Sequence, residues 1–374
     1  MTEISFMMRT HMISGEGSFA KLPSLLAERG FSRVGVMVDG AIASQPEVDR
    51  VLDEIKTRAK GYLRVEYTLK GEPTYDYLDQ VAAEFRRHMD LQAIVGLGGG
   101  SVMDTAKGVA LLMTNPGEGL KYRGFRKEVN DPLPTVCIPT TAGTGSETTY
   151  NAVFIDTKEG KKLGINSVKN FPVFCVLDPK LILSCPPSVI ASAGMDAVVH
   201  AVEGFVSKKA TYISRGFSIR AYRLLADNLK QVKKRPGDLE VLGKLQLGAY
   251  LAIIGLANSS AGPAGGLSYL LGTWYKVPHG TAGAFFLPEV HRFNRDHGYR
   301  DYGELAGSKD VIDELFELNE SLGIPRRMGD LNVPAESYER FVKGCLNDLK
   351  GAFDMNPVRM NESDIRGLLG RYYN

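Results

Sequence analysis

The first half of the chain alternates short apolar runs with amphipathic stretches. Between the apolar runs, the apolar positions of residues 47–58 and 77–88 recur with helical spacing, which predicts two helices. The runs themselves are rich in β-branched residues and predict strands at Arg33 to Val38, Leu91 to Val95, Thr135 to Ile138 and Val173 to Leu177. Strands and helices that alternate at this spacing are typical of a parallel sheet with helices on both faces.

Strand signals nearly vanish after Pro187. Apolar positions there repeat with helical spacing over five long stretches: Val189 to Val206, Tyr212 to Val232, Leu239 to Asn258, Val311 to Leu322 and Tyr338 to Leu349. The pattern changes at the Pro186-Pro187 pair. We therefore predict an α/β domain over residues 1–183 and an all-helical domain over residues 184–374, and we expect ligands to favour the cleft between them.

Composition supports this picture and removes several function classes. A length of 374 residues suits two domains, and 44% hydrophobic with 24% charged residues is ordinary for a globular protein. The net charge of +2 without a long basic stripe argues against a nucleic-acid partner. The N-terminus lacks the apolar run of a signal peptide, and no stretch approaches the ~20 apolar residues that span a bilayer. We expect a cytoplasmic protein with no membrane partner, and its scattered cysteines are predicted to be reduced: Cys137, Cys175, Cys185 and Cys345.

A glycine-rich turn, GLGGGSVMDTAK (96–107), follows the second predicted strand and enters a helix. Glycines let the backbone approach a ligand closely, and the amides and dipole at a helix start suit a pyrophosphate. Ser101 can cap the helix or donate to phosphate. The turn therefore predicts a nucleotide site at Gly98, Gly99 and Gly100, although a tight structural turn also fits the local sequence.

The preceding β–α unit ends at Val38-Asp39-Gly40. An acid at the tip of such a strand accepts from a ribose 2′-hydroxyl and repels a 2′-phosphate. Asp39 therefore favours NAD over NADP, while an ordinary turn aspartate explains the local sequence equally well. A second loop, IPTTAGTGSE (138–147), follows the third predicted strand with a dense run of hydroxyls and glycines that also suits ribose and phosphate.

The helical half carries a metal-like pattern. Asp196 and His200 are four residues apart, so they share one face of a predicted helix and can hold two positions around Zn²⁺ or Fe²⁺. A helix-surface ion pair is the ordinary alternative. His279, in Val277-Pro278-His279-Gly280, is a second candidate imidazole at a predicted helix start. His291 and His297 follow it and are the more plausible auxiliaries among the remaining histidines.

Taken together, these motifs resemble the iron-containing (group III) alcohol dehydrogenases over most of the chain. The resemblance is carried by GEGS (15–18), GGGSVMDTAK (98–107), IPTTAGTGSE (138–147), Lys162, LDP (177–179), GMDAVVHAVE (194–203) and PHG (278–280). It implies a Rossmann-like, dinucleotide-binding α/β domain followed by a helical domain, an architecture shared with dehydroquinate synthase. It also implies an NAD(P)-dependent alcohol dehydrogenase or aldehyde reductase that acts on a small-molecule substrate as a homodimer.

The same resemblance assigns roles to individual residues. The pyrophosphate and nearby ribose would be held by Gly98, Gly99, Gly100, Ser101 and Asp104, with Asp39 setting the NAD preference. The remaining assignments are Thr140, Thr141 and Thr149 on the nicotinamide side, Lys162 on the cofactor, Asn151 on the substrate, and Asp196, His200 and His279 on the metal.

One segment departs from the family pattern. The family has HxxxHPLG before the PHG loop, whereas residues 265–272 here read GGLSYLLG. Gly265 replaces the third ligand histidine, and Tyr269 replaces the histidine near the substrate. Three protein ligands plus water would still make a catalytic site for Fe or Zn. Alternatively the site is metal-free and Tyr269 acts as the acid; Tyr269 and His279 are thus the catalytic candidates.

Finer and rival interpretations remain. MTNPG (113–117), YRGF (122–125) and KLGINS (162–167) resemble the branch that contains 3-deoxy-octulosonate 8-oxidase, which would imply a polar, hydroxylated substrate. A sugar-phosphate cyclase-type lyase with NAD and a metal is one rival, although it needs a basic cluster that the helical half lacks. A metal-less, non-catalytic nucleotide-binding homologue is the other.

Overall fold

The computed structural model describes residues 3–87, 90–307 and 310–373, and it divides into two compact units. The α/β unit comprises Met8–Thr141 and Gly145–Cys185. The helical unit comprises Met1–Met7, Ala142–Thr144 and Pro186–Asn374. The α/β architecture followed by helices agrees with the fold class expected from the sequence. Of the helix predicted over residues 77–88, His88 lies outside the described residues.

A six-stranded parallel sheet forms the centre of the α/β unit, with the strand order β1-β9-β6-β4-β2-β3. Its strands are β1 (His11–Ser14), β2 (Arg33–Asp39), β3 (Gly61–Tyr67), β4 (Ala93–Gly98), β6 (Thr135–Pro139) and β9 (Phe174–Leu177). All four strands predicted from apolar runs are present as β2, β4, β6 and β9. Because β3 and β4 pair with opposite sides of β2, the chain reverses direction across the sheet between β2 and β4.

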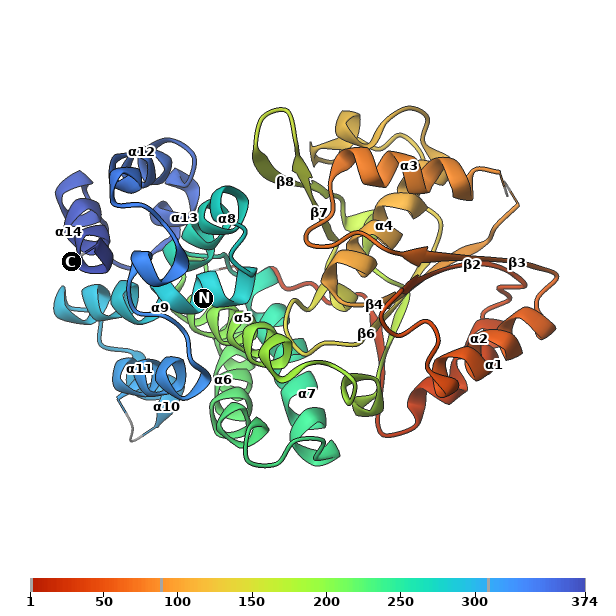
Figure 1. The fold of residues 1–374 in the computed structure, drawn as a ribbon, viewed down its shortest axis with the longest axis horizontal. Coiled ribbons are helices and arrows are strands. Elements are labelled where there is room, and N and C mark those ends of the chain that lie inside the picture. The colour runs from red at the N-terminus through yellow and green to blue at the C-terminus, as the bar shows by residue number, and fades with distance from the viewer. Residues whose placement is uncertain (1–2, 88–89, 308–309, 374) are drawn as a thin grey trace. The chain divides into compact units, whose positions relative to one another are not determined.

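Helices cover both faces of this sheet (Figure 1). α1 (Leu22–Glu28) and α2 (Pro46–Arg58) lie on one face, and α3 (Tyr75–Phe85) and α4 (Gly100–Thr114) lie on the other. Each face has its own apolar core: Val36 and Val95 point toward α1 and α2, whereas Met37 and Ile94 point toward α3 and α4. Neighbouring strand residues alternate between the two cores, as the pleat of a strand requires.

A second, smaller sheet of the α/β unit was not foreseen. It has the order β5-β8-β7 and consists of β5 (Gly124–Phe125), β7 (Asn151–Asp156) and β8 (Lys161–Asn166). β7 and β8 form an antiparallel hairpin in which Asn151 pairs with Asn166. This hairpin matters for the site because Asn151 and Lys162 lie on it.

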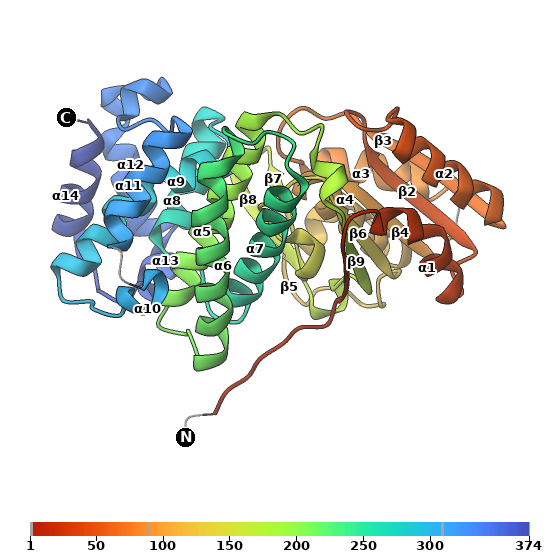
Figure 2. The same cartoon turned by 90° about the horizontal axis from the view of Figure 1, so that it is seen from below.

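The helical unit contains ten α-helices among its described residues, and Figure 2 shows α5, α6, α7, α8 and α9 packed side by side. They are α5 (Pro187–Val206), α6 (Tyr212–Val232), α7 (Leu239–Ala257), α8 (Pro263–Tyr275), α9 (His279–Asp296), α10 (Tyr302–Ala306), α11 (Val311–Leu322), α12 (Tyr338–Asn347), α13 (Lys350–Met355) and α14 (Glu362–Tyr373). Side chains of Thr211, Asp238 and Asp310 cap α6, α7 and α11, which explains why these helices begin where the sequence predicts.

Two helices of this unit have longer apolar stretches than expected. α5 and α7 each have the length and composition of a membrane span, contrary to the expectation that no stretch approaches one. Their most apolar windows are 78% and 61% buried inside the protein, which is the behaviour of core helices. The cysteines are free thiols as predicted, and burial raises the pKa of the Cys137 and Cys345 thiols to about 12.

Candidate active site

The reversal between β2 and β4 brings Asp39 and the glycine-rich turn together. Asp39 ends β2, Gly98 ends the adjacent β4, and a Cβ on Gly98 would lie only 3.0 Å from the Cβ of Asp39. The same Cβ would lie 2.6 Å from a methyl of Val102, so only glycine fits. Ligands of open α/β sheets bind outside the carboxyl ends of the strands at such a reversal.

The start of α4 has the features of an anion site. Gly99 is its N-cap, Gly100 and Ser101 follow, and the first amides of a helix have no partner within the helix. A Cβ on Gly96 would lie 2.8 Å from that of Ala106, so this glycine lets α4 pack closely against β4. Ser101 lies close to the side chain of Tyr67, the last residue of the edge strand β3.

Asp104 and Lys107 bind α4 to the second loop. The Asp104 carboxylate accepts from the Ser146 hydroxyl at 2.5 Å and from the Val153 amide at 2.9 Å, and it lies 3.1 Å from the Lys107 ammonium. Both of its oxygens are thus used within the α/β unit. The resemblance assigned this aspartate to the cofactor, and the structure adds a role in joining α4 to β7.

Lys107 belongs to the glycine-rich motif, but the sequence indicated no role for it. Its side chain is fully buried, and its ammonium donates to three backbone carbonyls, those of Ser146, Thr149 and Asn151. This ammonium therefore fixes the path of the chain from the second loop into β7. A signal existed in the sequence, because Lys107 is the one cation in the mostly apolar helix sequence GSVMDTAKGVALLMT.

The remaining predicted residues of the α/β unit lie on neighbouring elements. The Thr140 amide donates to the Gly98 carbonyl at 3.1 Å, which joins the second loop to the glycine-rich turn. Asn151 donates to the side chain of Asn166 across the hairpin, and the Lys162 ammonium pairs with Glu72 at 2.6 Å. The sequence indicated no role for Glu147 either. Its side chain is buried, and burial raises the pKa of its carboxyl to about 7.

In the helical unit, three predicted residues converge. Asp196 and His200 share one face of α5, with 3.7 Å between Asp196 Oδ1 and His200 Nε2. His279 opens α9, and its Nε2 lies 3.6 Å from the same carboxylate oxygen. Gly280 makes this approach possible, since a Cβ there would lie 1.8 Å from the Ser192 carbonyl oxygen of α5. The glycine of the PHG sequence is therefore a packing requirement.

α8 contributes two side chains to the same place. The Ser268 hydroxyl lies 3.0 Å from His279 Nδ1, and the Tyr269 ring lies 5.0 Å from the His279 ring at an angle of 57°. The Nδ1 atom of His200 is buried and has no hydrogen-bond partner among the residues that the structure describes. Asp196 and Ser268 are buried, whereas His200, Tyr269 and His279 are only partly buried.

Imidazole nitrogen and carboxylate oxygen are donors that Zn²⁺ and Fe²⁺ accept. Neighbouring ligands around a tetrahedral metal lie about 3.4 Å apart at ordinary bond lengths, which is close to the separation of Asp196 Oδ1 from each of the two imidazoles. No group of three His, Cys, Asp or Glu side chains among the described residues is already assembled to hold a metal. The donor types suit a divalent metal, and binding would have to bring the three side chains together around one ion.

Gly265, where the resembling family has its third histidine, lies beside a buried carboxylate. The Glu203 carboxylate accepts from the amides of Gly262, Ala264 and Gly265 at the start of α8. A Cβ on Gly265 would lie 2.8 Å from Glu203 Oε2, so a larger residue would displace this cap. Burial raises the pKa of Glu203 to about 7, and the three amides act against that shift.

The two auxiliary histidines have other partners. His291 Nδ1 hydrogen-bonds the Tyr302 hydroxyl at 2.7 Å, and burial lowers its pKa to about 3. His297 Nδ1 hydrogen-bonds the Phe293 carbonyl at 2.8 Å. These contacts give both residues a structural role within the helical unit.

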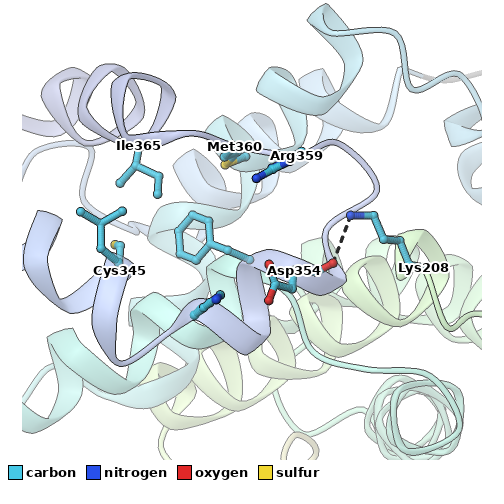
Figure 3. Close-up of a pocket in the computed structure, with 9 residues that line it drawn as sticks. Lys208, Cys345, Asp354, Arg359, Met360 and Ile365 are labelled. Carbon is cyan, nitrogen blue, oxygen red and sulfur yellow. Dashed lines mark hydrogen bonds between the residues drawn. The ribbon is translucent and has the colours of Figure 1, made fainter.

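A separate cavity of about 590 Å³ in the helical unit contains none of the predicted site residues (Figure 3). Its rim carries Lys208, Asp354 and Arg359, and Lys208 donates to the Asp354 carbonyl at 3.1 Å. Phe353 and Met360 are among its apolar lining. The predicted site residues of this unit therefore gather at the α5–α8–α9 contact and not at this cavity.

The chain is similar to known proteins over nearly its whole length. Residues 9–179 match the family described as iron-containing alcohol dehydrogenase, and residues 190–373 match the C-terminal part of the same family. The chain is 33% identical over 294 residues to 1,3-propanediol dehydrogenase of Citrobacter freundii, which covers 75% of each chain. It is 26% identical to lactaldehyde reductase of Escherichia coli, over 90% of this chain and 91% of that one.

A solved structure of similar fold contains a nicotinamide cofactor. Sulfoacetaldehyde reductase from Bifidobacterium kashiwanohense, in complex with NAD⁺, superposes with a TM-score of 0.90 at 25% identity and covers 99% of each chain. The likeness extends over both units, because nearly the whole of each chain is covered.

Proposed function

This chain belongs to the iron-containing alcohol dehydrogenase family, and on that premise we propose how its residues divide the work of one reaction. It is an alcohol dehydrogenase or aldehyde reductase that transfers a hydride between a nicotinamide cofactor and a small polar alcohol or aldehyde. The named relatives are alcohol dehydrogenases and aldehyde reductases, so neither a sugar-phosphate cyclase nor a non-catalytic homologue is favoured.

The α/β unit binds the cofactor in this proposal. The amides at the start of α4 and Ser101 hold the pyrophosphate, and Asp39 accepts from the adenosine ribose and selects NAD over NADP. Thr140, Thr141 and Thr149 line the nicotinamide side, Lys162 contacts the cofactor, and Asn151 contacts the substrate. The Asp104–Lys107 network supports these assignments, since it holds the loop and the hairpin that carry them.

The helical unit holds the metal in this proposal, with Asp196, His200 and His279 as ligands. The convergence of two imidazoles on Asp196 Oδ1 is the observation that carries it. A divalent Fe or Zn there supplies a Lewis acid that lowers the pKa of an alcohol. Asp196 contributes one negative charge and the imidazoles contribute neutral donors, so the set balances half of the charge of a divalent ion.

The test is Asp196→Ala in protein purified without chelators, with Glu336→Ala, an exposed acid of the same unit, as the matched control. We expect the variant to lose its bound metal and to lose kcat/KM by roughly 10²-fold or more, measured as NADH-linked turnover of 1,3-propanediol and lactaldehyde. NADH binding should persist, because its determinants lie in the other unit. Full activity in Asp196→Ala would exclude a metal role for this site.

Tyr269 is the proposed acid, next to His279. Its hydroxyl can donate to a carbonyl oxygen as the hydride arrives, and its ring already contacts His279. Tyr269→Phe keeps the ring and removes the hydroxyl, so metal content and NADH affinity should be unchanged while kcat falls by roughly 10²-fold or more. If the parent protein contains no metal yet turns over, the same variant should be inactive. A variant as active as the parent would remove Tyr269 from the chemistry.

The finer assignments remain predictions. The similarity of residues 113–117, 122–125 and 162–167 to the octulosonate oxidase branch points to a hydroxylated substrate, which a panel of sugar-derived aldehydes would test. Homodimerisation is proposed from the family resemblance, and a cytoplasmic location is proposed from the sequence features described above. Light scattering of the purified protein checks the first, and cell fractionation checks the second.

A further inference from the structure

We infer that Ser268 fixes the ring tautomer of His279, with the proton on Nδ1 and the lone pair on Nε2, the atom that faces Asp196. Ser268 is thereby a positioning residue for His279. The inference deepens the proposed function, because a histidine can bind a metal only through an unprotonated nitrogen.

The Ser268 hydroxyl has a single proton to donate. Ser268 Oγ lies 2.6 Å from the Gly265 carbonyl oxygen, one turn earlier in α8. A carbonyl oxygen can only accept, so the hydroxyl proton points at Gly265. Serine hydroxyls in helices commonly bond a carbonyl of the preceding turn in this way. The oxygen of Ser268 then has only lone pairs to offer elsewhere.

The same hydroxyl oxygen contacts the ring of His279. Ser268 Oγ lies 3.0 Å from His279 Nδ1. Because the hydroxyl proton is used at Gly265, Oγ accepts here and Nδ1 must carry the hydrogen. In a neutral imidazole the other nitrogen, Nε2, then bears the lone pair. Ser268 is only 1% exposed, so water does not compete for these bonds.

The lone pair in question is that of His279 Nε2, the ring nitrogen nearest to Asp196. His279 Nε2 lies 3.6 Å from Asp196 Oδ1, beyond an ordinary hydrogen bond, and His200 Nε2 lies 3.7 Å from the same oxygen. A lone pair on Nε2 that points toward a carboxylate is unfavourable without a cation between them. With Nδ1 held by Ser268, Nε2 of His279 presents its lone pair to any cation that binds beside Asp196.

The Ser268 hydroxyl bonds the backbone carbonyl of residue 265, which no substitution at 265 removes. A mutation can therefore test this interaction only by removing the hydroxyl of Ser268. Ser268→Ala deletes one oxygen from a buried site and leaves the fold of α8 in place. Ser337→Ala is a matched control in the same unit: Ser337 is also buried, donates to a carbonyl three residues earlier at 2.6 Å, and has a second partner, the Tyr373 hydroxyl, at 2.7 Å.

Two measurements test the inference. In the metal-free protein, nitrogen NMR of labelled histidine rings at alkaline pH, with His279→Gln for assignment, should show the Nδ1–H tautomer for His279. Ser268→Ala should convert this signal to a mixture or to the Nε2–H form, and Ser337→Ala should leave it unchanged. An Nε2–H tautomer in the parent, or the same tautomer in parent and Ser268→Ala, would overturn the inference.

The second measurement is the Zn²⁺ affinity of the metal-free protein by chelator competition. We expect Ser268→Ala to weaken it roughly 10- to 100-fold, with NADH affinity unchanged, and Ser337→Ala to match the parent. Equal Zn²⁺ affinity in parent and Ser268→Ala would also overturn it. A parent that shows the Nδ1–H tautomer yet binds no metal would contradict the proposed metal role and support the positioning by Ser268.

Discussion

The two units prepare their motif residues in different ways. In the α/β unit the motif side chains bind one another: Asp104 accepts from Ser146 and Val153, and Lys107 donates to three carbonyls. In the helical unit, Asp196 and the imidazoles lie just beyond hydrogen-bond distance, and backbone packing brings them together. A satisfied polar network holds its geometry without a ligand, whereas a carboxylate and imidazoles that lie close together without a hydrogen bond between them suit a cation.

The largest effect is expected at Lys107. Lys107→Met removes a buried cation, leaves three carbonyls without their donor and leaves the Asp104 carboxylate without its counter-charge. We therefore expect the free energy of unfolding to fall by about 3–5 kcal/mol, with loss of NADH binding. Urea unfolding and NADH fluorescence measure the two effects. Lys56→Met, at an exposed position on α2, should change stability by less than about 0.5 kcal/mol. A stable, NADH-binding Lys107→Met would show that the network is dispensable.

Gly280 tests the packing in the helical unit. Gly280→Ala places a methyl group 1.8 Å from the Ser192 carbonyl oxygen, so α9 must shift away from α5. We expect a loss of about 2–3 kcal/mol on urea unfolding and weaker metal binding. In Gly303→Ala a Cβ would meet nothing within 4 Å, so this variant should be as stable as the parent or more stable by up to about 1 kcal/mol. Unchanged metal affinity in Gly280→Ala would separate the glycine from the site.

Asp39 tests whether the α/β unit selects its cofactor by charge. Asp39→Ser removes the carboxylate that would repel a 2′-phosphate. We expect the ratio of NADPH to NADH dissociation constants to fall about tenfold or more, because one screened charge contact is worth about 1–2 kcal/mol at this range. Fluorescence titration with both cofactors measures the ratio. Asp53→Ser on α2 should leave it unchanged, and an unchanged ratio in Asp39→Ser would make Asp39 an ordinary turn residue.

Two buried glutamates, one in each unit, should make the stability of the protein depend on pH. Burial raises the pKa of Glu147 and of Glu203 from 4.5 to about 7. Between these pH values the folded protein keeps a proton that the unfolded chain has lost, so the stability from each group is present below pH 4.5 and is lost as the pH rises to about 7. Each can contribute a slope of at most about 1.4 kcal/mol per pH unit.

Urea unfolding between about pH 5 and pH 7 tests this linkage in Glu147→Gln and Glu203→Gln. Each variant should lose part of the negative slope that the parent shows, because glutamine does not titrate. Similar losses would mean that burial dominates in both units. An unchanged slope for Glu203→Gln alone would mean that the three amides of α8 hold its carboxylate ionised.

Elements with a clear apolar pattern were predictable, and those that mix charges with apolar residues were not. β2, β4, β6 and β9 are buried runs, and their pattern is local. β3 carries Arg64 and Glu66 because it is an edge strand, and edge strands commonly carry charges. β8 alternates exposed and half-buried residues around Gly164, so its sequence resembles a loop.

The sequence alone determined the residue types and their order: glycines at a strand–helix turn, an acid at the tip of β2, and Asp196 four residues before His200. These are local patterns, and helix or strand periodicity places them. Tertiary structure decided that Asp39 lies beside Gly98, that Lys107 spans to three carbonyls up to 44 residues away, and that Ser268 bonds His279. Those contacts depend on strand order and helix packing, which are set by the burial of whole faces and not by neighbours along the chain.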